Sequence, residues 1–246
     1  MQLIKLIGLA FLASLAFAIV TTASATARGL GILECVNVGP NNGGFNDAAC
    51  LVEGGSHEYK ENEVVGETFT SKASSTTVLA TSGRKIECLG AMNEGEVTSR
   101  TEDEATVRFT GCKEAASGVE CKSAGASAKE IETAVSSKIV SLGSGTSLVA
   151  GLLLSPHNAG GENVMEFECV GTQIKVYGSV IGSIGPESLM SLSFTATLAV
   201  DSTTKEQEIE ETTNSLRAKF AGGSTEKATL ASVVLLDFPL RVEIMG

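Results

Sequence analysis

Six cysteines are the residues of this chain whose type and number most clearly predict chemistry. No two are spaced as C-x-x-C, and no histidine stands at a metal-ligand spacing from any of them, which disfavours a zinc site. An even number of cysteines in an exported protein normally pairs as disulfides. We therefore expect disulfides among Cys35, Cys50, Cys88, Cys112, Cys121 and Cys169.

Disulfides require export, and residues 1–27 have the features of an export signal. Lys5 supplies a positive start, residues 7–20 form an apolar core, and Ala25-Thr26-Ala27 is a small-residue cleavage site, so the segment is predicted to be a signal peptide. No later segment approaches the roughly 20 apolar residues of a membrane span. We expect a secreted, extracellular protein, cleaved near Ala27 and without a transmembrane anchor.

Sequence proximity and side-chain facing favour one disulfide pattern. Cys35–Cys50 and Cys112–Cys121 would close short local loops. Cys88 and Cys169 both alternate with glutamates and should therefore point inward. A Cys88–Cys169 bond would then join two hairpins across the core.

The charge of the chain limits its partners. The formal net charge is −11, and loss of Lys5 with the signal peptide makes the mature chain one unit more acidic. Such a surface repels phosphate backbones and anionic lipid, and no cluster of Lys and Arg interrupts it in the sequence. Nucleic-acid binding is disfavoured, and an unidentified partner in the cell envelope or outside the cell is expected.

Two histidines could serve as general bases, His57 and His157. Both stand among loop-forming residues, and the chain has no G-x-S-x-G elbow, so neither is expected to be catalytic. His57 with Glu58 and His157 could make a partial metal site, but their distance in sequence makes the signal weak. We expect no catalytic, cofactor-binding or metal-binding residue.

Paired carboxylates are the other chemical candidate, because two of them can hydrolyse a glycosidic bond. Glu166 and Glu168 alternate with apolar residues and should lie on the solvent face of a strand, where a solvated role is the default. The chain has no Trp and two Tyr, whereas sugar clefts commonly use aromatic platforms.

The elements that position these residues are predicted to be strands. Apolar and polar residues alternate with period two through most of the chain, as in antiparallel sheets with one buried face. We expect about a dozen strands in one all-β domain over residues 28–246, with a weaker division near residue 185 as the alternative. A sandwich and a barrel fit equally well. The expected strands lie near residues 31–38, 64–70, 106–110, 130–134, 138–142, 147–154, 192–200, 215–220 and 240–244, and residues 205–211 suit either a strand or a short helix.

Two hairpins are specific enough to predict a register. A turn at Ser82-Gly83 would place Leu79 opposite Ile86 and Thr77 opposite Cys88. A turn at Gly171-Thr172 would join residues 164–170 to 173–181. It would place Cys169 opposite Ile174, Phe167 opposite Val176 and Met165 opposite Gly178.

Several stretches together resemble a group of secreted, cysteine-containing proteins of soil actinobacteria that have no assigned function. The resemblance spans most of the mature chain to about residue 184 and implies export, paired cysteines and β structure, but no site residue. The stretches that carry it are Phe109-Thr110-Gly111-Cys112, residues 119–125, Glu166-Phe167-Glu168-Cys169-Val170-Gly171, Gly178-Ser179-Val180-Ile181-Gly182, Cys35, residues 45–50 and Glu58-Tyr59.

We interpret the chain as a secreted, disulfide-stabilised β protein that acts without catalysis, by binding or as a component of the cell envelope or matrix. A barrel that encloses a small apolar ligand is one alternative. An extracellular hydrolase that uses carboxylates is the other.

Overall fold

The computed structural model describes residues 29–143, 149–157, 163–198, 207–209 and 212–246. The predicted signal peptide lies outside the described residues. The described chain is all-β, as predicted, and of the two predicted architectures the structure is a barrel.

Eight antiparallel strands close into the main barrel. Each pairs with the next, and the last, β19, pairs again with β3. In order around the barrel they are β3 (Thr68–Ala73), β6 (Gly90–Val97), β7 (Glu102–Thr110), β10 (Ile131–Leu142), β11 (Val149–Pro156), β14 (Val180–Gly185), β15 (Ser191–Leu198) and β19 (Thr225–Met245).

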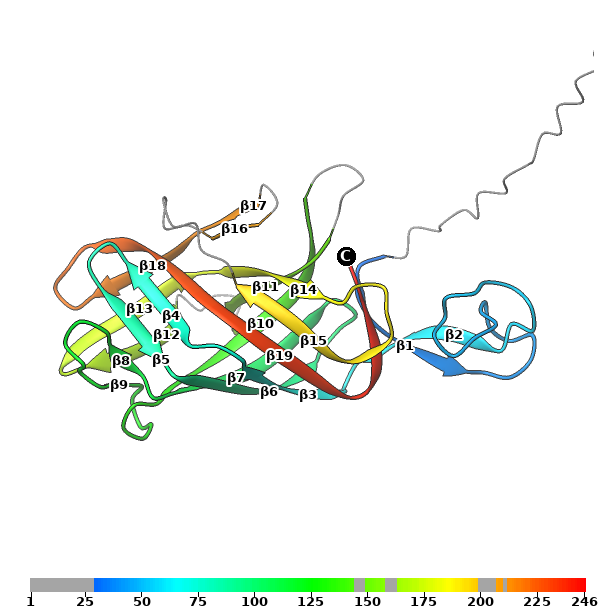
Figure 1. The fold of residues 1–246 in the computed structure, drawn as a ribbon, viewed down its shortest axis with the longest axis horizontal. Coiled ribbons are helices and arrows are strands. Elements are labelled where there is room, and N and C mark those ends of the chain that lie inside the picture. The colour runs from blue at the N-terminus through cyan, green and yellow to red at the C-terminus, as the bar shows by residue number, and fades with distance from the viewer. Residues whose placement is uncertain (1–28, 144–148, 158–162, 199–206, 210–211) are drawn as a thin grey trace, which may run out of the picture.

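A second ring of strands extends the main barrel along its axis, toward the left of Figure 1. Its strands are short, and an isolated bridge between Lys113 and Glu120 joins β8 to the chain just before β9. The order is β4 (Thr77–Thr81), β5 (Lys85–Cys88), β8 (Lys113–Glu114), β9 (Cys121–Lys122), β12 (Asn163–Cys169), β13 (Thr172–Gly178), β18 (Leu216–Phe220) and the first part of β19.

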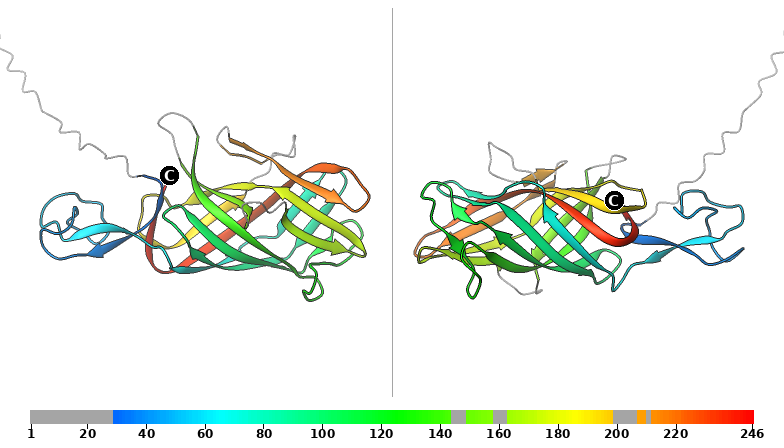
Figure 2. Two further views of the ribbon diagram at one scale, coloured as in Figure 1. Left: turned by 180° about the vertical axis from the view of Figure 1, so that it is seen from behind. Right: turned by 60° about the horizontal axis from the view of Figure 1, so that its bottom comes forward.

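β19 belongs to both rings and runs diagonally along the whole barrel (Figure 1). Residues 228–231 pair with β4 in the second ring, and residues 234–237 pair with β3 in the main barrel. Other strands of the second ring are short continuations of main-barrel strands. Only Leu89 separates β5 from β6, and only Ser179 separates β13 from β14. The result is one elongated barrel (Figure 2).

A separate lobe extends from the other end of the barrel (Figure 1, blue). β1 (Gly31–Asn37) pairs with the end of β19 through Ile32 and Ile244, and β2 (Tyr59–Glu63) pairs with the outer side of β1. Cys35–Cys50 ties the loop between these strands back onto β1. A small hairpin of β16 (Gln207–Ile209) and β17 (Thr212–Asn214) completes the described elements, so residues 207–209 are strand rather than helix.

The apolar side of each strand fills the barrel. Phe167, Ile139 and Ile174 are at most 2% exposed, while their strand neighbours of opposite parity face outward or are only partly covered. Phe238 packs its ring between Phe69 and Phe194, with ring centres 5.5 and 5.9 Å away. Each large apolar side chain buried in this way contributes about 1.5–3 kcal/mol.

The hairpin at Ser82-Gly83 has the predicted register, with Thr77 opposite Cys88 and Leu79 opposite Ile86. The register predicted for the other hairpin is wrong by two residues, since Cys169 lies opposite Thr172 rather than Ile174.

The cause of that error is the turn. Val170 and Gly171 both have positive φ, 43° and 72°, as a type I′ turn requires, whereas the prediction placed glycine first in the turn. A shift of two residues keeps every side chain on its predicted face. Met165, Phe167 and Cys169 are therefore still buried.

Several strands differ from expectation, above all β19, which spans Thr225–Met245 where a strand was expected only at residues 240–244. The two strands expected at residues 130–134 and 138–142 are one, β10, and the strand expected at 64–70 begins at Thr68. The hydrophobic pattern did not indicate β2, whose sequence is mostly charged, or β6, which contains two glycines.

All six cysteines form disulfides, but only one predicted pair is correct. Cys35–Cys50 is confirmed, whereas Cys112–Cys121 and Cys88–Cys169 are wrong. The structure contains Cys88–Cys112 and Cys121–Cys169 instead, with Cα–Cα distances of 4.0 and 4.2 Å.

The ring explains both errors. Cys112 and Cys121 are already joined through the backbone, because the Cys121 N–H donates to the Cys112 carbonyl at 3.1 Å. Cys112 therefore bonds to Cys88 on the neighbouring strand, and Cys121 bonds to Cys169. Both Cα–Cα distances are as short as those of non-hydrogen-bonded pairs in antiparallel strands. β8 and β9 separate Cys88 from Cys169, which at about 4.8 Å per strand exceeds the reach of a disulfide.

Candidate functional site

The wall of the barrel has a seam between β10 and β12. The start of β10 pairs with β7 on one side, but in the described residues no backbone pairing joins its other side to β12. Side chains bridge the seam instead. The Ser123 hydroxyl lies 3.1 Å from the Glu132 carbonyl and 3.0 Å from the Glu166 carbonyl, and it accepts a hydrogen bond from the Glu132 N–H. The Thr133 hydroxyl donates to the Val164 carbonyl.

Replacing Ser123 by alanine should lower the free energy of unfolding by about 1–3 kcal/mol, because three backbone groups lose the buried hydroxyl that they share. Chemical denaturation of the disulfide-bonded protein measures this. The control is Ser117→Ala, which removes an exposed hydroxyl beside Glu114 and should change stability by no more than about 0.5 kcal/mol. Equal effects of the two variants would mean that Ser123 does not hold the seam.

A polar groove of about 660 Å³ lies along the seam. Its side chains come from β9, the loop after it, β10, β12 and β13, so most of them stand on paired strands. The groove is lined by residues 122–125, Glu132, Thr133, Asn163, residues 165–168 and Gln173. It therefore brings together the predicted pair Glu166 and Glu168.

Glu166 is held firmly in this groove. Its carboxylate lies 3.2 Å from Lys175 Nζ and 3.1 Å from Asn163 Nδ2, and it also accepts a hydrogen bond from the Gln173 amide. Three donors on one carboxylate hold it in a fixed position as a hydrogen-bond acceptor. Such a group suits the positioning of a ligand.

Glu168 has a different environment one pleat away. It is exposed and lies directly opposite Lys122 of β9 and Gln173 of β13. Neither Glu168 nor Lys122 is in a salt bridge with another residue of the described chain. The groove thus presents both a constrained carboxylate and one that faces solvent.

The interior of the barrel contains a separate apolar cavity of about 80 Å³. Apolar side chains such as Leu152, Val180 and Leu198 dominate its wall, and the hydroxyls of Thr77 and Ser232 pair with each other at 2.9 Å. Pockets for drug-sized ligands are commonly about 300–1,000 Å³. Side chains therefore occupy most of the space that a barrel could offer to a ligand.

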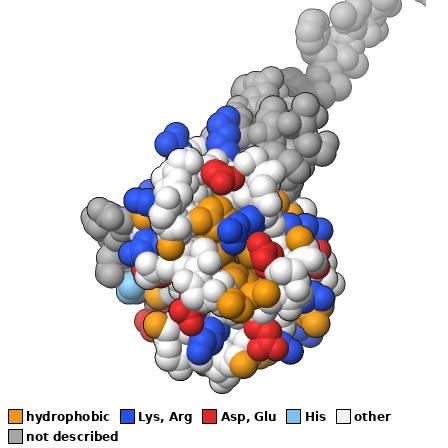
Figure 3. Space-filling model, turned by 90° about the vertical axis from the view of Figure 1, so that its left-hand side faces the viewer, with side chains coloured by type: hydrophobic (Ala, Val, Ile, Leu, Met, Phe, Trp, Pro, Cys, Tyr) orange, Lys and Arg blue, Asp and Glu red, His pale blue; other side chains and the backbone are white. Residues whose placement is uncertain are grey.

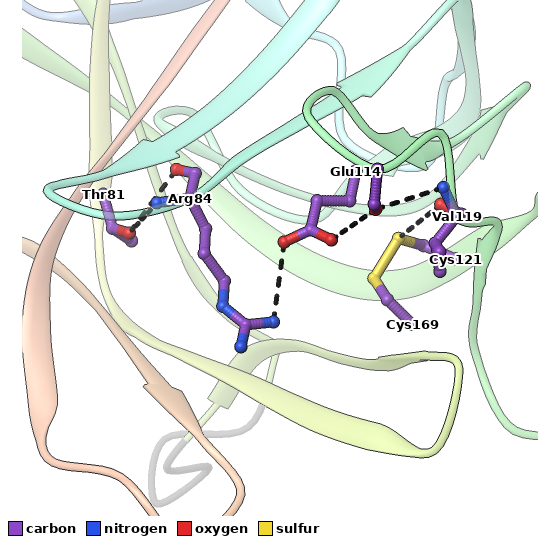
Figure 4. Close-up of polar contacts among 7 residues, drawn as sticks. Thr81, Arg84, Glu114, Val119, Cys121 and Cys169 are labelled. Carbon is purple, nitrogen blue, oxygen red and sulfur yellow. Dashed lines mark hydrogen bonds and ion pairs between the residues drawn. A yellow bond between two sulfur atoms is a disulfide. The ribbon is translucent and has the colours of Figure 1, made fainter.

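The open end of the second ring is closed by side chains. Hydrophobic residues gather in its centre among charges of both signs (Figure 3). Arg84, at the turn between β4 and β5, lies with its guanidinium 4.8 Å from the ring centre of Phe220. Figure 4 shows the same guanidinium beside Glu114, at 3.6 Å. The Ser117 hydroxyl donates to the same glutamate at 2.5 Å. This end is therefore a packed cap over the core.

The two histidines lie in different parts of the molecule. His57 is in the loop before β2, where its carbonyl accepts a hydrogen bond from the Gly43 N–H. His157 follows β11, and its Nδ1 lies 3.7 Å from a Glu104 carboxylate oxygen. Within the described ranges, no three His, Cys, Asp or Glu side chains are grouped so as to hold a metal.

One buried acidic residue was not among the candidates predicted from the sequence. Asp103 is 5% exposed and accepts a hydrogen bond of 2.5 Å from the Ser137 hydroxyl. Burial raises the pKa of Asp103 to about 6, and the hydrogen bond from Ser137 offsets part of that rise. The signal was available, because Asp103 has the same parity as Ala105 and Phe109, which point inward.

The described residues include no helix of the length and apolarity needed to cross a membrane. Comparison of the chain with models of protein families, with curated proteins and with solved structures finds no match.

Proposed function

We propose that this chain acts outside the cell as a binding protein without catalytic activity, and that the seam groove holds its ligand. The observation that carries the proposal is the groove itself, a recess of about 660 Å³ lined by hydrogen-bonding groups on paired strands. Three buried or partly buried crosslinks support an extracellular setting, because disulfides persist in oxidising compartments.

The groove favours a ligand rich in hydrogen-bond donors. Its lining includes the carboxylates of Glu132, Glu166 and Glu168 but only one cation, Lys122. Arg108 neutralises Glu132 at 3.0 Å, and Lys175 neutralises Glu166 at 3.2 Å. Glu168 therefore remains the natural partner for an ammonium group, and Gln173 beside it can bond a hydroxyl.

The partners of Glu166 also support binding over hydrolysis. A carboxylate-based hydrolase needs one carboxyl group that holds a proton for the leaving group. Lys175, Asn163 and Gln173 all contact the Glu166 carboxylate, so its oxygens already have partners and are not directed at a leaving group.

An amine-bearing saccharide tests the proposal. Glucosamine oligomers should shift the backbone amide signals of Lys122, Glu168 and Gln173 in an NMR titration, and Glu168→Gln should weaken binding about tenfold through loss of a charge-assisted hydrogen bond. The matched control is Glu94→Gln, an exposed glutamate on β6, which should leave affinity unchanged.

Two results would count against this proposal. Release of smaller saccharides during the titration would replace binding with hydrolysis. Equal affinity of glucosamine oligomers and their N-acetylated forms would remove the role assigned to the carboxylates.

A further inference from the structure

The fold gathers cations that are far apart in the sequence onto one outer face of the second ring. Lys175 on β13 lies directly opposite Lys219 on β18, and Tyr177 lies directly opposite Arg217. Arg217 in turn lies opposite Lys227 on β19. Lys219, Arg217 and Lys227 are exposed, and Lys175 and Tyr177 are half-buried.

Such a placement costs stability in the absence of an anion. Like charges directly opposite each other on neighbouring strands repel, and this face has two such pairs. Lys175 is compensated by Glu166 at 3.2 Å. Arg217 and Lys219, however, form no salt bridge with an acidic side chain in the described part of the chain. Arg217 and Lys219 are therefore two exposed cations on one strand that no described carboxylate neutralises.

The spacing of these cations suits an extended polyanion. Neighbouring strands are about 4.8 Å apart, and alternate residues on a strand are about 6.8 Å apart, so the cations form a grid of that size. At physiological ionic strength charges are screened beyond about 8 Å. Neighbouring cations of the grid therefore act together on one ligand.

The neighbouring aromatic ring narrows the chemistry of the ligand. Tyr177 lies directly opposite Arg217 on the neighbouring strand. The tyrosine ring can stack on the apolar face of a sugar, and the guanidinium can form two hydrogen bonds to a carboxylate. We propose that the outer face of β13 and β18 is a docking surface for a carboxylated polysaccharide. This surface borders the seam groove along β13, but Arg217 and Lys219 do not line the groove, and the proposal does not depend on the function proposed for it.

Polygalacturonate oligomers provide the test, with fully methyl-esterified oligomers as the uncharged control. Calorimetric titration of the disulfide-bonded protein should detect binding of the acid form alone. The double variant Arg217→Gln/Lys219→Gln should bind at least about tenfold more weakly, since two charge-assisted contacts are lost. Its thermal unfolding should show an intact fold, because both side chains are exposed.

The matched control is Lys60→Gln/Lys72→Gln, which makes the same change in net charge on other exposed strands. It should bind polygalacturonate as the native protein does. Equal loss in both double variants would overturn the docking surface, because net charge alone would then explain binding. Tighter binding of inorganic polyphosphate than of polygalacturonate would overturn the assignment to carboxylates.

The acidic stretch of the same chain is the competing occupant. Glu206, Glu208 and Glu210 precede β18 in the sequence. Binding of polygalacturonate that is seen only after all three are changed to Gln would overturn the proposal, because the face would then belong to this stretch. Glu168→Gln should leave polygalacturonate binding unchanged, which separates this surface from the groove.

Discussion

Replacement of Cys121 and Cys169 together by alanine is expected to lower the free energy of unfolding by about 4 kcal/mol. The bond closes a loop with a sequence separation of 48, the longest of the three disulfide loops, and loop entropy grows with that length. It also joins β9 to β12, which pair through only two residue positions beside the seam. Loss of the bond should therefore weaken the groove as well as the fold.

Denaturant unfolding of the two oxidised proteins measures the change. The matched control is Cys35→Ala/Cys50→Ala, whose sequence separation of 15 corresponds to about 3 kcal/mol. Hydrogen exchange should distinguish the two variants, because the Cys35–Cys50 bond lies in the lobe and its loss should leave the barrel amides protected. A larger loss of stability in the lobe variant would contradict the importance given to the bond beside the seam.

The second large effect is a dependence of stability on pH that centres on Asp103. Its pKa in the folded protein is about 6 and its ordinary value is 3.8, so the folded state holds a proton that the unfolded chain releases between these pH values. Stability from this group is complete below pH 3.8 and is lost as pH rises through 6. The full loss is about 3 kcal/mol.

Asp103→Asn should remove this loss, because the amide oxygen can still accept from Ser137 without a buried charge. At pH 7.5 the variant should be up to about 3 kcal/mol more stable than the native protein, and near pH 4 the two should be similar. Unfolding curves across this pH range provide the measurement. Glu96→Gln, an exposed change on β6, is the control and should retain the native pH profile. Parallel profiles for native protein and Asp103→Asn would contradict the assignment.

Much of the fold could be predicted because alternation is a local signal. Each strand that places one face on the core repeats its apolar residues at every second position, as β18 does with Leu216, Ala218 and Phe220. Two of the missed strands, β2 and β6, show little of that signal. β2 forms a charged outer strand, and β6 carries Gly95 where a Cβ would lie 2.4 Å from the Phe69 ring. At position 95 the close packing needs the absence of a side chain, so this position adds nothing to an apolar pattern.

The site was harder to predict because it depends on which strands become neighbours. Cys88 and Cys112 are paired through the order of strands in the ring, which sequence proximity does not reveal. In the sequence nothing distinguishes Ser123 from other loop serines. Its hydrogen bonds exist only because the fold places β10 and β12 on either side of it. Glu166 and Glu168 were recognised as outward-facing, but the groove between them and Glu132 exists only after the barrel has closed.

The sharing of β19 by both rings bears on when this protein can finish folding. Because β3, β4, β15 and β18 all need β19 as a neighbour, neither ring can close before Thr225–Met245 has been synthesised. A nascent chain that has reached only residue 224 holds every cysteine but still has an open wall. Such a chain cannot enclose the core, so both rings close only after the last strand of the sequence has been made.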